Sequence, residues 1–363
     1  MKKWTGFEKG MGIGGWLTNY KRFNVLPQER RLQLTVGDME HFETYITEKD
    51  IAYIASLGMD HIRLCFDQIV VEESEGVYRE NICSIIENFI KWCSKYNLNV
   101  VLNLHKAVGN YCDIREDVKL LDDKKLQDRF ISLWKFFEER FSAYPDAAFE
   151  ILNEVTNVDP EKWNDLAEKT IDSIREINPD RWIVVGSVCW GDVKKLELLR
   201  VFDDEKVVYT FHTYVPFEFT HQRGVLIENT CYYNRNMYYP DSIERYKDYQ
   251  KTVLNNPDAY DGYDRMDSKF IRDGLMPAVE FMKKNPDKIL WCGEFGSIRH
   301  AELESRENWM NDVISFLKEN KIPYCVWNYL STPYDGNRFS LVDDDKRRIL
   351  SSRLADIISG NIR

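Results

Sequence analysis

The chain has 363 residues, of which 44% are hydrophobic, 30% charged and 13% aromatic, an ordinary globular composition apart from the high aromatic content. Its formal net charge is −11, and no block of lysine and arginine interrupts the acidic balance, which argues against nucleic acid or an anionic membrane as a partner. No stretch approaches the roughly 18 apolar residues of a membrane span, and the N-terminal sequence MKKWTGFEKG lacks the apolar segment of a signal peptide, so we expect either a cytoplasmic protein or a secreted one whose leader has been removed.

Short apolar runs of strand length recur along the chain, and each is nearly continuous, as is typical of parallel strands buried on both faces. In chain order they cover residues 10–16, 60–66, 98–105, 147–154, 182–187, 206–212, 288–295 and 323–329. Amphipathic segments predict helices at residues 47–58, 80–96, 124–142, 160–177, 192–200, 269–284, 302–320 and 346–359. This alternation predicts an α/β fold, a (β/α)8 TIM barrel. A doubly wound open sheet is the alternative, but no G-x-G-x-x-G motif follows a strand.

One interval breaks this alternation. The distance from the sixth predicted strand to the next helix is far longer than an ordinary loop between a strand and a helix. The interval is too aromatic for a disordered linker, so residues 216–268, approximately, are predicted to form a small inserted subdomain within a single domain of residues 1–363. In a barrel, the loop after a strand lies on the face that carries the active site.

Polar or aromatic side chains stand at or near the ends of six predicted strands, and in a barrel these ends meet at one mouth. The residues are Arg63, His105, Asn153, Glu154, His212, Tyr214, Glu294 and Trp327. Glu154 and Glu294 each follow an apolar run, so two carboxylates are expected to face each other, although either one alone would be read as the solvated start of a loop. Such a pair can hydrolyse a glycosidic bond, with retention at a separation of about 5–5.5 Å and inversion at about 6.5–9.5 Å.

Arg63 lies inside an apolar strand, where an unpaired charge would be costly, so it needs an acidic partner. Glu294 would serve, because the guanidinium would keep that carboxylate ionised; a structural ion pair with an unrelated acid is the alternative. The strand-end histidines, His105 and His212, raise the question of a metal site. The chain has no H-x-H or H-E-x-x-H motif, and we expect no metal.

Three tryptophans near strand ends are candidate platforms for a sugar ring. Trp327 is the strongest candidate, with a core position as the alternative, and Trp16 and Trp190 share the same ambiguity. Gly293 and Gly296, which flank Glu294, are interpreted as room for a sugar ring to approach the carboxylate closely.

The motifs HIRLCF, VVLNLH, FEILNEV, VYTFHTY, WCGEFG and VWNY resemble, in order and strand placement, those of glycoside hydrolase family 5, the cellulase family of clan A. The stretches FHTYVPFEFTHQ and AELESR are most similar to the clostridial endoglucanase C branch, whose members carry an inserted subdomain after strand six. The resemblance covers nearly the whole chain. The N-E pair on strand four combined with G-E-F-G on strand seven is its most specific part.

The resemblance implies a retaining endo-β-1,4-glucanase, acting on cellulose or mixed-linkage β-glucan, with Glu154 as general acid/base and Glu294 as nucleophile. It implies that Asn153 binds the sugar's 2-hydroxyl, that Tyr214 steadies the nucleophile, and that Arg63, His105, His212 and Trp327 belong to the same active site. The expected partner is a polysaccharide or oligosaccharide, bound by a monomer without a cofactor. One departure is Lys106, which stands where many relatives have a second consecutive histidine.

The substrate stays open on the sequence alone. Mannan, xyloglucan or xylan would be cleaved by the same pair of carboxyl groups, and so would a β-glucan attacked from its chain end, because specificity depends on the pocket around one or two hydroxyls. A non-catalytic carbohydrate-binding barrel is the alternative of a different class, and the presence of both carboxylates argues against it.

Overall fold

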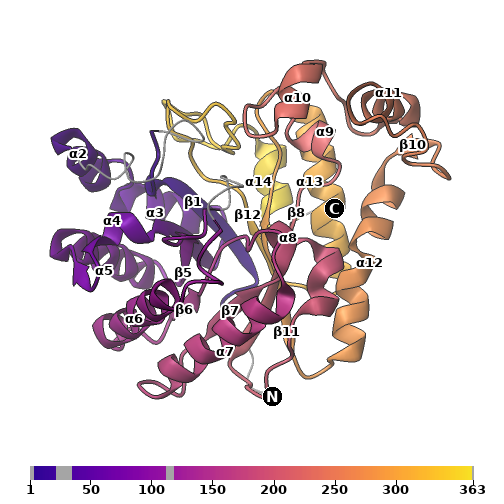
Figure 1. The fold of residues 1–363 in the computed structure, drawn as a ribbon. Coiled ribbons are helices and arrows are strands. Elements are labelled where there is room, and N and C mark those ends of the chain that lie inside the picture. Colours follow the sequence, from indigo (N-terminus) through magenta and orange to yellow (C-terminus); the bar gives the residue numbers. More distant parts are fainter. Residues whose placement is uncertain (1–3, 22–34, 112–117, 362–363) are drawn as a thin grey trace.

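The computed structural model describes residues 4–21, 35–111 and 118–361. Eight strands form a closed barrel in the order β1-β12-β11-β8-β7-β6-β5-β2, and all neighbouring strands are parallel (Figure 1). They are β1 (Lys9–Leu17), β2 (His61–Asp67), β5 (Asn99–Lys106), β6 (Ala147–Glu150), β7 (Ile183–Gly186), β8 (Val207–Thr213), β11 (Ile289–Phe295) and β12 (Tyr324–Val326). The predicted TIM barrel is confirmed. Closure of the sheet excludes the open doubly wound alternative.

Helices surround the barrel and cover its outer face (Figure 1). They are α2 (Val36–Thr44), α3 (Glu48–Ser56), α4 (Gln68–Val71), α5 (Glu80–Lys95), α6 (Lys124–Phe141), α7 (Pro160–Arg175), α8 (Val188–Gly191), the 3-10 helix η1 (Val193–Leu198), α12 (Ser268–Lys284), α13 (Leu303–Glu319) and α14 (Ser352–Ile358). None of these helices, within the described residues, is long and apolar enough to cross a bilayer.

Local chemistry explains where several helices begin. Helix α7 starts with Pro160 after Asp159, whose carboxylate accepts a hydrogen bond from the Glu161 amide at 3.0 Å. Helix α14 starts later than predicted because the Ser351 hydroxyl caps it by accepting from the Leu354 amide at 2.9 Å.

A two-stranded hairpin, β3 (Glu72–Ser74) and β4 (Val77–Tyr78), lies between α4 and α5.

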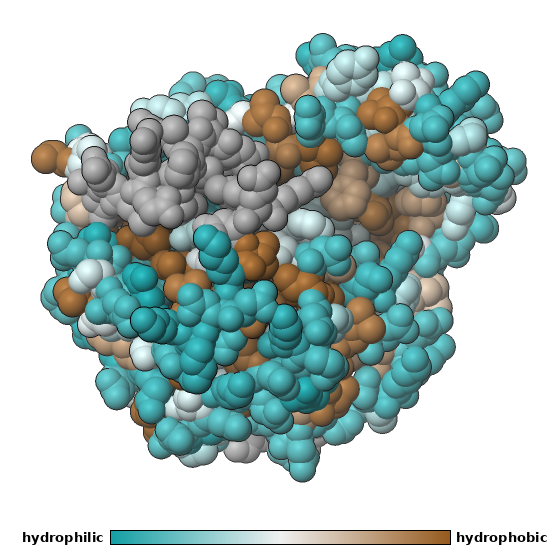
Figure 2. All heavy atoms as spheres, in the orientation of Figure 1, coloured by the Kyte–Doolittle hydropathy of each residue, from teal (hydrophilic) through white to brown (hydrophobic). Residues whose placement is uncertain are grey.

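The residues between β8 and α12 hold further elements, at the upper right of Figure 1: α9 (Phe217–Thr220), α10 (Glu228–Tyr233), β9 (Asp241–Ser242), α11 (Ile243–Leu254) and β10 (Arg265–Met266). Tyr239 fixes this segment to α13, since its hydroxyl donates to Asp312 at 2.7 Å and its amide donates to Ser305 at 3.1 Å. Figure 2 shows hydrophobic surface where this segment meets the barrel. That the segment is a subdomain serving the active site stays a prediction.

An apolar plug fills the lower end of the barrel. Trp4 stacks on Phe7 with ring centroids 4.4 Å apart and meets Trp291 edge-on at 5.5 Å, and inward side chains of five strands complete the cluster. These are Val101, Ala148, Val184, Val208 and Cys325. The buried polar residues Arg63 of β2 and Glu150 of β6 lie between this apolar cluster and the carboxyl ends of the strands.

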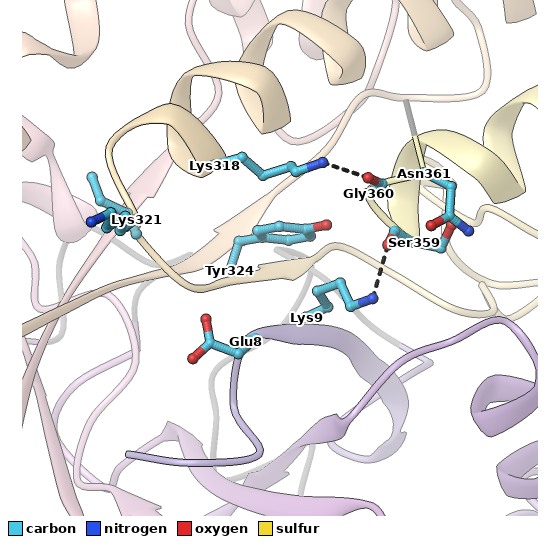
Figure 3. A pocket seen from close by; sticks show the side chains of 9 residues that line it. Glu8, Lys9, Lys318, Lys321, Tyr324, Ser359, Gly360 and Asn361 are labelled. Atoms are coloured by element: carbon cyan, nitrogen blue, oxygen red, sulfur yellow. Dashed lines mark hydrogen bonds between the residues drawn. The ribbon is translucent and has the colours of Figure 1, made fainter. Parts of the chain in front are cut away.

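A hollow of about 360 Å³ opens at the same end of the barrel as this plug, where β1 and β12 begin (Figure 3). Its polar groups hold the end of α14: Lys9 Nζ donates to the Ser359 carbonyl at 2.9 Å, Lys318 Nζ donates to the Gly360 carbonyl, and the Tyr324 hydroxyl donates to the Ile358 carbonyl at 2.9 Å. These contacts satisfy the last carbonyls of a helix. The hollow therefore has a structural explanation, and it lies at the end of the barrel away from the predicted site.

Candidate active site

Both oxygens of the Glu294 carboxylate are held by hydrogen bonds from different sides. Arg63 Nη1 donates to Oε2 at 2.6 Å, and the Tyr214 hydroxyl donates to Oε1 at 2.6 Å. Glu294 lies next to the end of β11, Arg63 lies inside β2, and Tyr214 follows β8 directly, so three parts of the barrel converge on one carboxyl group. All three side chains are buried.

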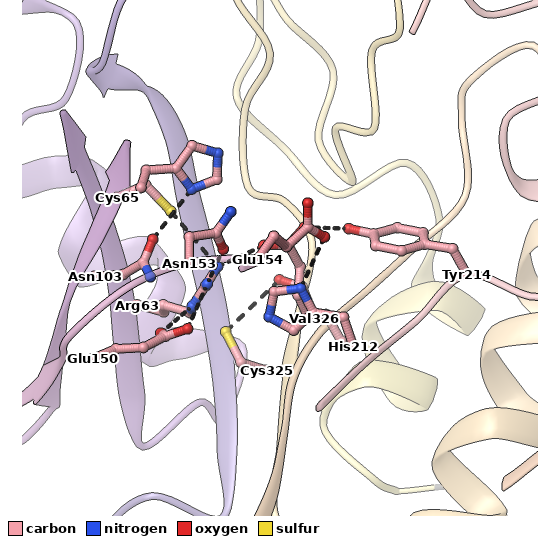
Figure 4. A network of polar contacts seen from close by, with 12 residues as sticks. Arg63, Cys65, Asn103, Glu150, Asn153, Glu154, His212, Tyr214, Cys325 and Val326 are labelled. Carbon is pink, nitrogen blue, oxygen red and sulfur yellow. Dashed lines mark hydrogen bonds and ion pairs between the residues drawn. The ribbon is translucent and has the colours of Figure 1, made fainter. Parts of the chain in front are cut away.

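Arg63 also forms a two-pronged ion pair with Glu150, from its Nε at 2.6 Å and its Nη2 at 2.9 Å (Figure 4). Its Nη2 donates in addition to Asn153 Oδ1 at 2.7 Å. Both expectations for Arg63 therefore hold at once, because it pairs with Glu294 and with a second, deeper acid. Such a fork fixes the plane of a guanidinium and hence the direction of its remaining N–H groups.

Glu154 lies beside His212, whose Nδ1 is 3.0 Å from its Oε1 (Figure 4). Glu154, Glu294 and His212 each place one polar atom so that all three atoms lie within 4.8 Å of one another. One oxygen of Glu154 and one of Glu294 are therefore close enough for retention, which takes a carboxyl separation of about 5–5.5 Å, and closer than the approximately 6.5–9.5 Å of inversion.

The surroundings of Glu154 and Glu294 shift the pKa values of the two carboxyl groups in opposite directions. Burial raises the pKa of Glu154; the His212 hydrogen bond opposes this, and the negative charge of Glu294 adds to the rise. Burial alone would also raise the pKa of Glu294, but the charges of His212, Arg63 and His105 and the Tyr214 hydrogen bond outweigh it and lower that pKa. Two carboxyl groups with separated pKa values are the arrangement that an acid and a nucleophile require.

The same trio of side chains is the one group within the described residues with the geometry of a possible metal site. Both oxygens of Glu294 already accept a hydrogen bond, from Arg63 and from Tyr214, and Glu154 Oε1 contacts His212. A guanidinium 2.6 Å from Glu294 would also repel a second cation. The donor set therefore does not favour a metal ion.

Comparison with known proteins identifies the family. Residues 23–332 match the model described as cellulase (glycosyl hydrolase family 5). The chain is 36% identical to endoglucanase C of Acetivibrio thermocellus over 97% of its length and 98% of the relative's.

The chain belongs to glycoside hydrolase family 5.

Two other matches agree with this assignment. Cellodextrinase A of Ruminococcus flavefaciens is 34% identical over 85% of this chain and 81% of its own sequence. Among solved structures, a Thermotoga maritima Cel5A complex with cellobiose superimposes with a TM-score of 0.73 at 25% identity, covering 97% of each chain.

Trp327 lies at the mouth of this family 5 barrel, just past β12, and is half-buried. Its ring is nearly parallel to that of His105, at an angle of 5° and a centroid distance of 5.8 Å. The indole lies against β1, where a Cβ atom on Gly14 would be 2.4 Å from it and one on Gly12 would be 2.9 Å away. Gly12 and Gly14 therefore make room for this tryptophan. Its role as a platform stays a prediction.

The expectation that Trp16 binds substrate is not supported. Its side chain is 1% exposed, its indole N–H donates to the Phe42 carbonyl at 2.7 Å, and its ring meets Phe89 edge-on at 5.7 Å. Trp16 therefore points from β1 toward the surrounding helices, and it has no free face for a sugar. Trp190 is half-buried, and its amide donates to Val155, the residue after Glu154, at 2.8 Å. That position is compatible with substrate contact, which stays a prediction.

The interpretation of Gly293 and Gly296 also needs correction. A Cβ atom on Gly293 would lie 2.5 Å from the Thr210 hydroxyl, and one on Gly296 would lie 2.1 Å from the Trp327 carbonyl. The lack of a side chain at Gly293 and Gly296 therefore lets the end of β11 pack closely against Thr210 and Trp327. This packing explains both glycines without a ligand. Lys106, the departure from the family pattern, is buried opposite Asp67 of β2.

Glu150 is the site residue that the sequence reasoning missed. It is an acid inside the apolar run of residues 147–154, the same signal that singled out Arg63, but the strand was predicted to end at Glu154 and Glu150 was therefore passed over. The structure ends β6 at Glu150 itself. The signal that could have paired the two is an opposite charge on each of two buried strands, β2 and β6, that are separated in the barrel by one strand, β5.

Proposed function

We propose that this enzyme is a retaining endo-β-1,4-glucanase that cleaves β-linked glucans, with Glu294 as nucleophile and Glu154 as general acid/base. The observation that carries the proposal is a pair of carboxyl groups with one oxygen of each within 4.8 Å of the other, one group with a raised pKa and one with a lowered pKa. The names of its relatives, endoglucanase C and cellodextrinase A, support a β-glucan substrate.

In the first step, a Glu294 oxygen attacks the anomeric carbon and the bond to the leaving oxygen breaks. Glu154 gives its proton to that oxygen, and a covalent glycosyl ester forms on Glu294. Arg63 and Tyr214 hold the attacking carboxylate ionised and aimed. The oxygen of Asn153 is engaged by Arg63, which turns its amide nitrogen toward the sugar's 2-hydroxyl in this proposal.

In the second step, Glu154 has become a carboxylate and accepts a proton from water. The resulting hydroxide adds to the anomeric carbon and releases Glu294, so that two inversions restore the β configuration. His212 Nδ1 lies 3.0 Å from Glu154 Oε1 and can donate a hydrogen bond to Glu154 when Glu154 is ionised.

Proton NMR of fresh hydrolysis products tests the mechanism. Wild-type enzyme acting on an aryl β-cellobioside should release the β anomer first, before mutarotation. An initial α anomer would refute double displacement.

The substrate is tested on carboxymethylcellulose, barley β-glucan, lichenan, glucomannan, xylan and xyloglucan. We expect reducing sugar from the first three, with viscosity falling long before most bonds are cut, since internal cleavage shortens chains fastest. Release of cellobiose without an early fall in viscosity would indicate exo action. Preference for glucomannan, xylan or xyloglucan would replace the β-glucanase assignment.

The remaining parts of the proposal concern the whole protein. We propose that residues 1–363 act as one catalytic unit, as a monomer that needs no metal, nucleic acid or membrane. Light scattering after gel filtration tests the oligomeric state, and unchanged activity after dialysis against a chelator tests metal independence. A Glu294→Ala protein with unaltered turnover would instead support a non-catalytic role for this carboxylate.

A further inference from the structure

Three buried rings contact one another beside the candidate nucleophile. His221 meets Tyr214 edge-on with centroids 5.1 Å apart and meets Phe339 at 5.0 Å, while Tyr214 and Phe339 are 5.6 Å apart. The interplanar angles are 67°, 63° and 77°, so each pair has the edge-to-face geometry that aromatic rings prefer. The Tyr214 phenol is therefore held by two rings from different loops.

Tyr214 needs such support because it lies outside the barrel strands. Strand β8 ends at Thr213, and the hydroxyl that donates to Glu294 at 2.6 Å is carried by the first residue of the following loop. A hydrogen bond of this length to a charged group loses much of its strength when the donor moves. The rings that pack on Tyr214 thus determine how well Glu294 is held.

His221 is in turn locked by its neighbour Thr220. The Thr220 hydroxyl donates its one proton to the Tyr214 carbonyl. The Thr220 oxygen also lies 3.0 Å from His221 Nδ1, so His221 Nδ1 carries the proton and donates it to Thr220. The Thr220 carbonyl accepts from the Ile298 amide at 2.9 Å, which ties the arrangement to the loop after Glu294. Burial lowers the pKa of His221 to about 3, so its ring stays neutral in the working range and does not compete with Arg63 for Glu294.

We propose that His221 is a positioning residue, which clamps the Tyr214 phenol against Phe339 and thereby keeps the Tyr214 hydroxyl on Glu294. The inference rests on the proposed role of Glu294 as nucleophile. It assigns a function to the start of the segment between β8 and α12, from which His221 comes.

The test compares His221→Ala with His221→Phe, using kcat/KM for an aryl β-cellobioside as a function of pH. Removing the ring should move the acid limb upward by about 1 pH unit and lower kcat about tenfold, because one hydrogen bond to a charged group is weakened. KM should change little, since Tyr214 acts on Glu294. His221→Phe keeps the ring and should recover most of the loss. His300→Ala, an exposed histidine, is the matched control.

A double-mutant cycle separates positioning from a general structural effect. In a Tyr214→Phe background the hydroxyl is gone, so His221→Ala should add no further shift of the acid limb. An equal shift in both backgrounds, or an unshifted acid limb in His221→Ala, would overturn the proposal. If His221→Ala does not fold, His221→Leu takes its place. Failure of the proposed function is recognised separately, by an α-anomeric first product from the wild type.

Discussion

The two carboxyl groups of the site differ in what surrounds them more than in how deeply they lie. Glu294 accepts from a guanidinium and a phenol, both within 2.6 Å, whereas Glu154 has His212 at 3.0 Å and the negative charge of Glu294 nearby. Hydrogen bonds to the charged form favour ionisation, and a like charge opposes it. Two glutamates are thereby given the two protonation states that the first step requires.

Substitution of each glutamate should separate the two roles. Glu294→Gln removes the attacking oxygen and should abolish turnover of every substrate. Glu154→Gln should reduce cleavage of a β-glucan by about 10²–10⁴-fold, which is the usual contribution of general acid catalysis, yet form the glycosyl ester at nearly normal speed when the leaving group is dinitrophenol. A pre-steady-state burst measures that step. Equal losses on the polymer and on the aryl substrate would contradict the assignment of Glu154.

The raised pKa of Glu154 also predicts how stability varies with pH. Because burial raises this pKa in the folded protein, the contribution to stability is complete below the unfolded value of about 4.3 and is lost as the pH rises through the folded value. Glu154→Gln removes this dependence. Its melting temperature, measured relative to wild type, should therefore increase as the pH rises from 4 through the folded pKa of Glu154 and then level off. Glu304→Gln, at an exposed position of α13, is the control and should show a flat difference.

The role of Glu150 can be tested against a control, because the chain contains a second buried arginine–glutamate pair with the same geometry. Arg181 and Glu138 form the same two-pronged buried contact, at 2.6 and 2.9 Å, away from the site. Removing Glu138 leaves the buried Arg181 without an acidic partner, and Glu138→Ala should cost about 3–5 kcal/mol of unfolding free energy. Removing Glu150 leaves Arg63 paired with Glu294, so Glu150→Ala should cost less than Glu138→Ala. Denaturant titration measures this loss.

Only Glu150→Ala should alter catalysis. With Glu150 gone, the charge of Arg63 acts on Glu294 alone, which lowers the pKa of Glu294 further and moves the acid limb of kcat/KM to lower pH. The guanidinium also loses its fixed plane, and kcat should fall about tenfold or more. Identical pH profiles for Glu150→Ala and Glu138→Ala would show that Glu150 serves stability only.

At the level of elements, the strand ends determine which side chains meet. Glu154 lies four residues after β6, Trp327 directly follows β12, and Glu294 is the penultimate residue of β11. The glycine-rich strand β1 contributes by what it lacks, because Gly12 and Gly14 leave the space in which the Trp327 indole lies. Glycines on one face of a strand allow an aromatic side chain to pack directly against the strand backbone.

Gly14→Ala should therefore disturb substrate binding without touching a carboxyl group. The new Cβ would lie 2.4 Å from the Trp327 ring, a rigid group that must move. If Trp327 is the sugar platform, KM for cellooligosaccharides should rise about tenfold, the value of one aromatic contact, while the acid and basic limbs keep their positions. Gly37→Ala, where the nearest atom is 3.8 Å away, is the control. An unchanged KM for Gly14→Ala would remove Trp327 from the binding site.

Prediction from sequence succeeded where one local rule decides and failed where tertiary neighbours decide. The eight buried strands and the meeting of Arg63 and Glu294 followed from apolar runs and charge burial. Trp16 was misjudged because it neighbours a strand end, and only packing reveals that it faces α2 and α5. Gly293 was misjudged for the same reason, since its close neighbour Thr210 lies on another strand.

At the scale of the whole molecule, three loops join into one wall beside the mouth. The Ile298 amide donates to the Thr220 carbonyl at 2.9 Å and the Arg299 amide to the Arg338 carbonyl at 2.8 Å. Asn337 completes the wall, since its Oδ1 accepts from the Leu226 amide at 2.9 Å. The segment after β8 is thus linked to the loops after β11 and β12, and exposed apolar residues such as Phe217 and Val225 stand on it.

Asn337→Ala should loosen this wall from one end. Loss of a hydrogen bond worth about 1 kcal/mol should make local opening about fivefold more frequent, and Arg223, exposed on the adjoining turn, should then be cleaved faster by trypsin. Asn236→Ala is the control, because Asn236 contacts the Arg223 side chain at 3.1 Å without reaching the β12 loop. If the wall guides long chains, Asn337→Ala should lose more activity on β-glucan than on an aryl cellobioside. Equal trypsin cleavage of both variants would show that Asn337 does not hold the segment in place.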